Sequence, residues 1–192
     1  RRKPYEIRLF HFFIWNDLDQ NPISNEGVQK LMTNLAERRK QLIKAINSKD
    51  IRLISSEIKK MEGPIRESQV ILEHHYNKTG HSVYYIEKQV YLASLDNITN
   101  ESGKIYYNQV KAGRNGSETT LVELQSHGNL KAQIDDTIQA AANDNVYAGF
   151  YFDNPSPFIK QYISDKATEK NLGTKFQVIS NKDFLVKYKI QN

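Results

Sequence analysis

Residues 96–111 hold the side chains best suited to metal-assisted chemistry. They read D-N-I-T-N-E-S-G-K-I-Y-Y-N-Q-V-K. Aromatic and β-branched residues favour a strand over 105–111. The N-E-S-G segment before it, residues 100–103, is typical of a turn. We therefore expect a β-hairpin in which Asp96 ends the first extended run.

Such a hairpin would hold the Asp96 carboxylate, the Gln109 amide and the Lys111 amine close together. Gln109 and Lys111 are two residues apart, so we expect their side chains on the same face of the strand. A carboxylate and an amide oxygen suit a hard divalent cation, and a lysine suits an attacked phosphate. The alternative interpretation is an ordinary surface hairpin.

The elements that must position this stretch follow from residue patterns on either side. Before it, we expect a helix over 65–76 that ends near Gly80, and extended segments with a further turn inside 82–98. After it, the patterns predict a loop at 112–119, a short strand at 120–124, a helix at 129–142, a strand at 146–152, a helix at 158–170 and a strand at 176–179.

The first third of the chain has a different character. It reads as a strand over 5–15, a helix from Ser24 or Asn25 to about Asn47, and a second helix capped by Asp50. Gly63 and Pro64 are expected to stop or kink that second helix. We therefore predict an N-terminal strand and helical lobe at 1–64, and an α/β core at 65–192 built on a mixed sheet flanked by helices.

Composition excludes several classes of protein. The 192 residues are 39% hydrophobic and 26% charged, as in globular domains. The absence of cysteine excludes disulfides, zinc–thiolate sites and cysteine nucleophiles, and it fits a reducing compartment. No apolar run reaches transmembrane length and no signal peptide is evident, so we expect a cytoplasmic protein without a membrane partner.

The chain is mildly basic, with a formal net charge of +5 and a pI near 9.2. This balance is compatible with a phosphate-rich partner. Solvated helix faces are the alternative explanation of the basic clusters. The expected nucleic-acid contacts are Arg38, Arg39, Lys40, Arg114 and Lys131.

The order of elements around residues 96–111 resembles the PD-(D/E)XK nuclease superfamily, over about residues 65–180. The closest resemblance is to Mrr-like restriction endonucleases with a Q-x-K motif and to Holliday-junction-resolvase-like proteins. The matching features are Asp96, the G-K-I-Y-Y-N-Q-V-K run and the helix–strand pair at 129–152. The resemblance implies a restriction-endonuclease-like fold and a Mg²⁺- or Mn²⁺-dependent nuclease acting on DNA in restriction, phage defence or repair.

The resemblance also implies roles for single residues. Asp96 would be the metal-binding aspartate, Gln109 the second motif position, and Lys111 the lysine that orients or polarises the attacking water. The carbonyl of Val110 would be a further metal ligand.

Many members of the superfamily add a glutamate from the preceding helix, for which Glu67 or Glu73 could serve. The chain departs from the usual pattern at Gln109, which replaces an acid, and at Leu95, where many members have proline. The alternative function is therefore a catalytically inactive nuclease-fold protein that binds nucleic acid or protein. A homodimer or a partner subunit, contacted through the helical lobe, is compatible with both.

Two other groups of residues compete with this motif as candidate sites. Glu123, Leu124 and Gln125 form an E-x-Q triplet that ranks below the Gln109–Lys111 motif. The five histidines contain no H-E-x-x-H motif and no pair spaced by four. We therefore expect partly exposed helix histidines at 74 and 75 and no zinc site. His81 and His127 remain alternative acid–base residues.

Overall fold

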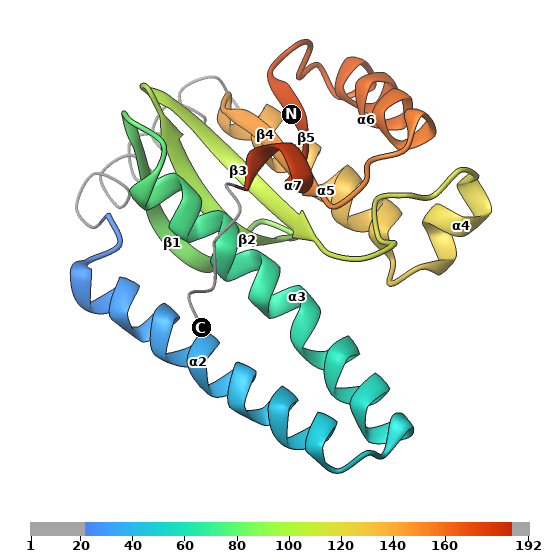
Figure 1. The fold of residues 1–192 in the computed structure, drawn as a ribbon. Helices are drawn as coiled ribbons and strands as arrows, with labels where there is room; N and C mark the ends of the chain where they lie inside the picture. Colours follow the sequence, from blue (N-terminus) through green and yellow to red (C-terminus); the bar gives the residue numbers. More distant parts are fainter. Residues whose placement is uncertain (1–21, 186–192) are drawn as a thin grey trace.

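The computed structural model describes residues 22–185, and the strand expected at 5–15 lies outside this part of the chain. Figure 1 shows the arrangement of the elements. Along the chain they are α2 (Asn25–Asn47), α3 (Ile51–Tyr76), β1 (His81–Val90), β2 (Ala93–Glu101), β3 (Lys104–Lys111), α4 (Leu121–Ser126), α5 (Leu130–Asp144), β4 (Tyr147–Phe152), α6 (Pro157–Glu169), β5 (Phe176–Ser180) and α7 (Asn181–Phe184).

The described part of the chain forms one five-stranded mixed sheet with the order β1-β2-β3-β4-β5. Strands β1, β2 and β3 are an antiparallel meander, whereas β4 and β5 continue parallel to β3. Helix α3 packs on β1, β2 and β3, and α5 packs on β2, β3 and β4 (Figure 1). A helix, three antiparallel strands, a helix and a parallel strand make a restriction-endonuclease-like core. The expected fold class is confirmed.

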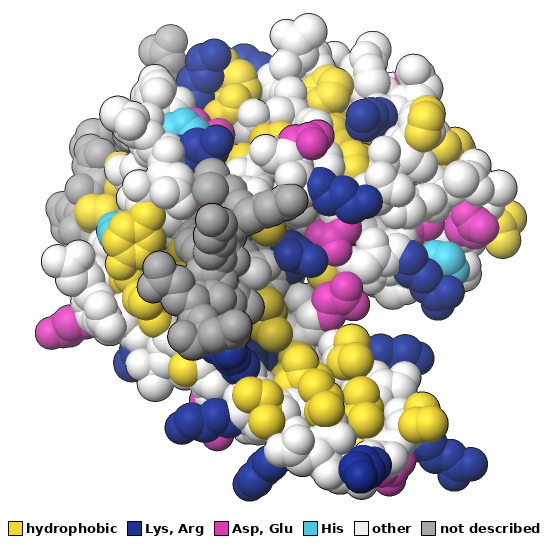
Figure 2. All heavy atoms as spheres, in the orientation of Figure 1, with side chains coloured by type: hydrophobic (Ala, Val, Ile, Leu, Met, Phe, Trp, Pro, Cys, Tyr) yellow, Lys and Arg dark blue, Asp and Glu magenta, His cyan; other side chains and the backbone are white. Residues whose placement is uncertain are grey.

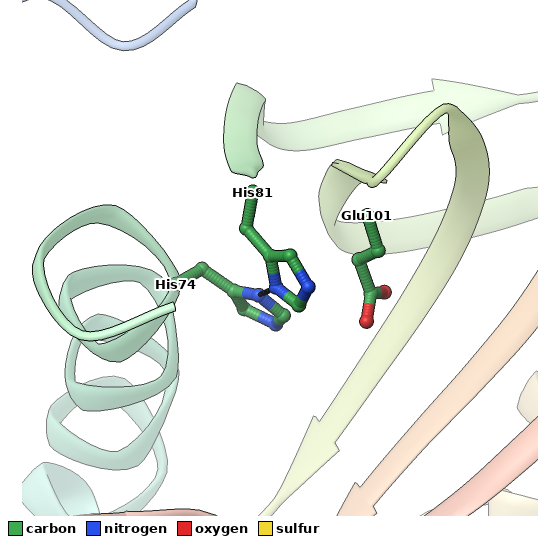
Figure 3. A group of neighbouring side chains, drawn as sticks. All are labelled: His74, His81 and Glu101. Atoms are coloured by element: carbon green, nitrogen blue, oxygen red, sulfur yellow. Dashed lines mark hydrogen bonds between the residues drawn. The ribbon is translucent and has the colours of Figure 1, made fainter. Parts of the chain in front are cut away.

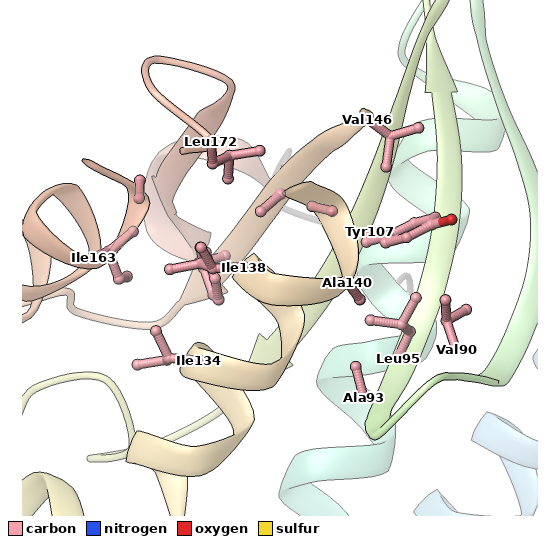
Figure 4. Close-up of a cluster of buried hydrophobic side chains, with 14 of the residues drawn as sticks. Val90, Ala93, Leu95, Tyr107, Ile134, Ile138, Ala140, Val146, Ile163 and Leu172 are labelled. Atoms are coloured by element: carbon pink, nitrogen blue, oxygen red, sulfur yellow. The ribbon is translucent and has the colours of Figure 1, made fainter. Parts of the chain in front are cut away.

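The main apolar core lies between the sheet, α5 and α6, as Figure 4 shows. Ile134 and Ile138 of α5 are fully buried there together with Tyr107 and Phe150 of the sheet. The apolar stripe of α5 explains why this helix could be predicted from residue spacing. This core fixes β3 and β4 side by side, in the register that places Lys111 next to Phe152.

The opposite face of the sheet, under α3, is far more polar. Asn97, Thr99 and Asn108 are completely buried. The Asn108 amide nitrogen donates to Asn97 Oδ1 at 2.9 Å and to Thr99 Oγ1 at 2.8 Å. Buried polar groups are costly unless they are paired. Hydrogen bonds between side chains therefore join β2 to β3 on this face.

Helix α3 is continuous through Pro64, so it does not stop at Gly63 and Pro64, which was one of the two expected outcomes. Proline normally excludes the helical conformation of the preceding residue, partly through a clash with that residue's Cβ. Gly63 has no Cβ, which removes this part of the clash. The expected boundary between residues 64 and 65 consequently falls inside one helix.

The half of α3 before Pro64 pairs with α2 to form an arm, which Figure 1 shows extending away from the sheet. Of α3's buried residues, Met61 alone precedes Pro64. Figure 2 shows apolar side chains on the face of the arm turned towards the viewer. Large apolar side chains are exposed on both helices of the arm. They are Met32, Ile43, Ile46, Ile51, Leu53 and Ile58.

The short strand expected at 120–124 is also wrong, because this segment is helix α4. Thr120 Oγ1 accepts a hydrogen bond from the Glu123 N–H, and Glu123 in turn accepts one from the Thr119 N–H at 2.8 Å. This reciprocal arrangement is close to a capping box, which favours a helix over a strand.

The close approach of β4 to Asn108 gives a test of the polar face. A Cβ at Gly149 would overlap the Asn108 Oδ1 atom. The Asn108 amide cannot easily turn away, because its Nδ2 atom donates hydrogen bonds to Asn97 and Thr99. We expect Gly149→Ala to lower the free energy of unfolding by about 1–3 kcal/mol in urea denaturation. In the double variant with Asn108→Ala the clash disappears, so the combined loss should be smaller than the sum of the two single losses. Strict additivity would contradict this packing.

Candidate active site

Asp96 lies within β2 and not at the end of an extended run as expected, because the further turn comes earlier, at Tyr91 and Leu92. Its carboxylate sits where β2 stops pairing with β3, whose ladder begins at Asn97. Asp96 Oδ2 accepts a hydrogen bond from the Val110 N–H at 2.7 Å. The carboxylate thus replaces a ladder bond and is fixed against the end of β3.

The Lys111 amine lies 4.0 Å from Asp96 Oδ2, and both side chains are more than four-fifths buried. Burial raises the pKa of Asp96, while Lys111 and the Val110 N–H act in the opposite direction. The structure therefore brings Asp96 and Lys111 together, as the hairpin pattern indicated. A lysine and an aspartate in this setting form a pair from which water is largely excluded.

Glu67 supplies a second carboxylate from α3. Burial first, and then the charge of Asp96, raise the pKa of Glu67 to about 7, although Lys111 and Arg38 lower it. Of the two glutamates proposed from the sequence, Glu67 is the one on which the charge of Asp96 acts. Glu73 is fully buried and accepts a hydrogen bond from Asn77 at 3.1 Å.

Gln109 is buried, and its amide nitrogen is directed towards α5. Nε2 donates to the Ser94 carbonyl at 2.7 Å and to Thr137 Oγ1 at 3.0 Å. Although Gln109 and Lys111 are two residues apart, they have different partners: Gln109 contacts Ser94 and Thr137, whereas Lys111 lies beside Asp96. Gln109 Oε1 is buried without a hydrogen-bond partner. That oxygen is the atom through which Gln109 could bind a cation.

Asp96 and Glu67 are the carboxylates that could hold a hard divalent cation here. Asp96 and Glu67 are carboxylates whose charged forms are disfavoured by burial, and a cation beside them would relieve that cost. The partnerless Gln109 Oε1 would add a neutral oxygen. Within residues 22–185, one group of three His, Asp or Glu side chains has ligand atoms within 4.8 Å of one another, and it does not include Asp96 or Glu67. Closure around an ion here would therefore need side-chain movement.

Two features of the surroundings were missed by sequence reasoning. Glu87 is exposed, has a φ of 55°, and lies with Asp96 between the Ile86–Asn97 and Lys88–Leu95 pairs. Its charge raises the pKa of both Asp96 and Glu67. Nothing in the sequence of β1 marks this glutamate, because its place depends on an irregular β1–β2 register.

The second feature is an ion pair that supports the end of β3. Arg66 of α3 binds Asp153 with Nε at 2.8 Å and Nη2 at 3.2 Å. Asp153 also accepts hydrogen bonds from the Gly113 N–H at 2.8 Å and from Asn181 at 2.9 Å. An aspartate directly after a buried strand is a signal that could have indicated this role. The network holds the loop that follows Lys111.

The predicted nucleic-acid contacts differ in how available they are. Arg39 and Arg114 are exposed, and so is Lys40, which lies 3.7 Å from Glu37. Arg38 is half-buried, and its charge lowers the pKa of Glu67. The Lys131 amine is held by Asp135 at 2.7 Å.

Basic and acidic side chains are interspersed on the face seen in Figure 2, both on the arm and beside the hollow next to it. No single-sign patch dominates this view.

The competing triplet at Glu123 is not a strand motif. Glu123 belongs to the first turn of α4, where it accepts hydrogen bonds from the backbone and the hydroxyl of Thr119. Its carboxylate therefore serves a helix terminus.

Comparison with protein-family models and with curated proteins finds no match for this sequence. Among solved structures, the chain is similar to that of SfsA from Pyrococcus furiosus in complex with Ca²⁺, with 14% identity and a TM-score of 0.39. The similarity covers 62% of this chain and 55% of that one, so the chain spans little more than half the length of SfsA. A likeness at this level has no bearing on activity. None of the helices in the described part is both long and apolar enough to cross a membrane.

The raised pKa of Glu67 predicts how its replacement changes stability with pH. The folded state binds the proton up to about pH 7, whereas an unfolded glutamate releases it near 4.5. Rising pH therefore costs stability across this window, and Glu67→Gln removes the cost. In EDTA, we expect the variant to be more stable than wild type at pH 8 by about 1–2 kcal/mol, after allowance for solvent screening, with the difference fading towards pH 4.

Urea denaturation at several pH values measures this difference. Glu62→Gln, the same change at an exposed position of α3, should stay within about 0.5 kcal/mol of wild type. A Glu67→Gln effect that does not vary between pH 4 and pH 8 would contradict the buried, charge-coupled glutamate.

Proposed function

We propose that this protein is a metal-dependent nuclease of the PD-(D/E)XK type that hydrolyses DNA phosphodiester bonds. The observation that carries the proposal is the buried Asp96–Lys111 pair at the end of β3, whose charges act on the Glu67 carboxylate. The resemblance of the surrounding sequence to Q-x-K nucleases supports the same conclusion. Restriction, phage defence or repair is the class of role that such an activity would serve.

Asp96, Glu67 and the free oxygen of Gln109 are the side-chain groups that would hold Mg²⁺ or Mn²⁺, with the Val110 carbonyl as a further ligand. Such an ion, when bound, lowers the pKa of a water molecule and neutralises charge on a phosphate. The hydrogen bonds of Gln109 Nε2 to Ser94 and Thr137 orient its oxygen. The bond from the Val110 N–H orients the Asp96 carboxylate in the same way.

Lys111 and Glu67 would then divide the proton and charge chemistry. The Lys111 amine offers positive charge to the phosphate oxygen that becomes more negative as water attacks. Without the ion the pKa of Glu67 is about 7, and a cation bound beside it would favour the ionised form, which can accept a proton from that water. Arg38 lowers the pKa of Glu67 and so links the arm to the site.

DNA is the proposed substrate, with Arg39, Lys40 and Arg114 as exposed contacts for its phosphates. The exposed apolar side chains of the arm suit contact with a second subunit, in keeping with a homodimer or a partner subunit.

A second candidate is a nuclease-fold protein that binds nucleic acid without cleaving it. The observation that favours it is the motif position of Gln109, which offers an amide oxygen where most nucleases have a carboxylate. That substitution leaves less negative charge to bind a cation.

Cleavage assays with Lys111→Ala test the proposal directly. We expect wild type to cleave DNA in Mg²⁺ or Mn²⁺ and to be inactive in EDTA. Lys111→Ala, Asp96→Asn and Glu67→Gln should each lose at least about 100-fold in rate, the usual effect of removing a group that stabilises developing charge. Lys104→Ala, at the other end of the same strand, is the matched control and should keep wild-type activity.

Supercoiled, linear and single-stranded DNA and RNA should be compared as substrates. Cleavage that persists in EDTA, or that is unchanged in Lys111→Ala, would contradict the assignment of this site. Binding of DNA with no cleavage in either metal would favour the second candidate instead.

Salt dependence of DNA binding tests the contacts on α2. Each phosphate contact that is lost lowers the slope of log K against log salt by about 0.9. We expect the double variant Arg39→Ala, Lys40→Ala to bind more weakly, with a slope reduced by about 2. Lys131→Ala serves as the control, because its amine is already paired with Asp135. Fluorescence anisotropy at several salt concentrations measures both, and an unchanged slope in the double variant would remove α2 from the interface.

A further inference from the structure

A second group of possible metal ligands lies on the α3 face of the sheet, as Figure 3 shows. His74 comes from α3, His81 begins β1, and Glu101 ends β2. One ligand atom from each lies within 4.8 Å of the other two. The sequence predicted partly exposed histidines on this helix, but His74 is completely buried and directed at the other two side chains.

The two imidazole rings already have nearly the separation that a shared metal ion requires. His74 Nδ1 and His81 Nδ1 are 2.9 Å apart, and the rings are stacked with an interplanar angle of 30°. Two nitrogen ligands of a tetrahedral Zn²⁺ lie about 3.3 Å apart, because each Zn–N bond is about 2.0–2.1 Å long. A small rotation of His81, which is only half-buried, is enough to reach this spacing.

Other polar groups orient the three residues from outside. His74 Nε2 lies 3.0 Å from the Tyr151 hydroxyl, which leaves its Nδ1 facing His81. Glu101 Oε2 accepts hydrogen bonds from Thr99 Oγ1 at 3.0 Å and from Gln177 Nε2 at 3.2 Å. Metal-binding histidines and carboxylates are commonly held by such partners. Burial also lowers the pKa of His74 to about 3, so its ring is neutral at physiological pH.

We propose that His74, His81 and Glu101 bind a divalent transition-metal ion of the zinc class. Two imidazoles and one carboxylate are a known zinc ligand set, and a water molecule completes the tetrahedron on the half-exposed side of His81 and Glu101. The ion joins the last turn of α3 to the ends of β1 and β2. This site is separate from Asp96 and does not rest on the proposed nuclease activity.

Lys78 is the positive charge that opposes a cation here. It acts on both His74 and His81, and its amine lies over the Phe184 ring at 5.0 Å. Glu101 supplies the compensating negative charge. Removal of the lysine should therefore tighten metal binding, a change in the opposite direction from the loss of a ligand.

Metal titration of tag-free protein tests the site. After removal of metals with a chelator, Zn²⁺ is titrated by calorimetry, and Co²⁺ by the visible absorption of its tetrahedral complexes. We expect the Asp96→Asn variant, in which the other site is disabled, to bind one Zn²⁺ with a Kd in the micromolar range or below and to melt at a higher temperature when zinc is added. His81→Ala and Glu101→Gln should each weaken this binding by at least about 100-fold.

Two controls make the outcome specific. His75→Ala changes the neighbouring histidine, which packs against Tyr76, and should bind zinc as the parent protein does. Lys78→Gln should bind zinc more tightly. The proposal is overturned if the Asp96→Asn protein binds no zinc, or if His81→Ala binds it with unchanged affinity. Neither result would alter the cleavage outcomes that decide the nuclease proposal.

Discussion

The polar layer buried between α3 and the sheet is the constraint on which the rest of this molecule depends. Asn97, Thr99, Asn108 and His74 are all completely buried there, on the face where a sheet usually carries an apolar core. Each must find a partner or lose stability. Their hydrogen bonds can be satisfied in few arrangements, so this layer restricts how β2, β3 and α3 sit together. The apolar core under α5 supplies most of the burial, and the polar layer supplies the specificity.

Charge burial explains why the candidate active site is costly to build. Asp96 and Glu67 both lie in partly dry surroundings, and burial raises their pKa values although the charge of Lys111 lowers them. Such strain is typical of sites that bind a cation or move a proton. A variant that became more stable on replacement of Glu67 but lost activity would show the usual trade-off between stability and activity.

Much of the framework could be predicted from the sequence, because α5 and β4 have regular apolar patterns that their tertiary contacts reinforce. The proximity of Asp96 and Lys111 could be predicted for the same reason, from a local hairpin. Residue patterns fail where distant contacts decide. Gln109 faces α5 because Thr137 receives its amide, and Glu87 reaches Asp96 through an irregular register. Helix α3 continues through Pro64, where the missing Cβ of Gly63 removes part of the clash that proline makes with the residue before it.

Helix α3 carries both Glu67 and His74, about two turns apart and on the side that faces the sheet. The spacing between the two proposed sites is therefore fixed by one helix. Inserting a single residue between them would turn one relative to the other by about 100° and shift it by about 1.5 Å. Chains that diverge from this one could change the loop before the helix, but the stretch from Glu67 to His74 could change in length only by losing one site or the other.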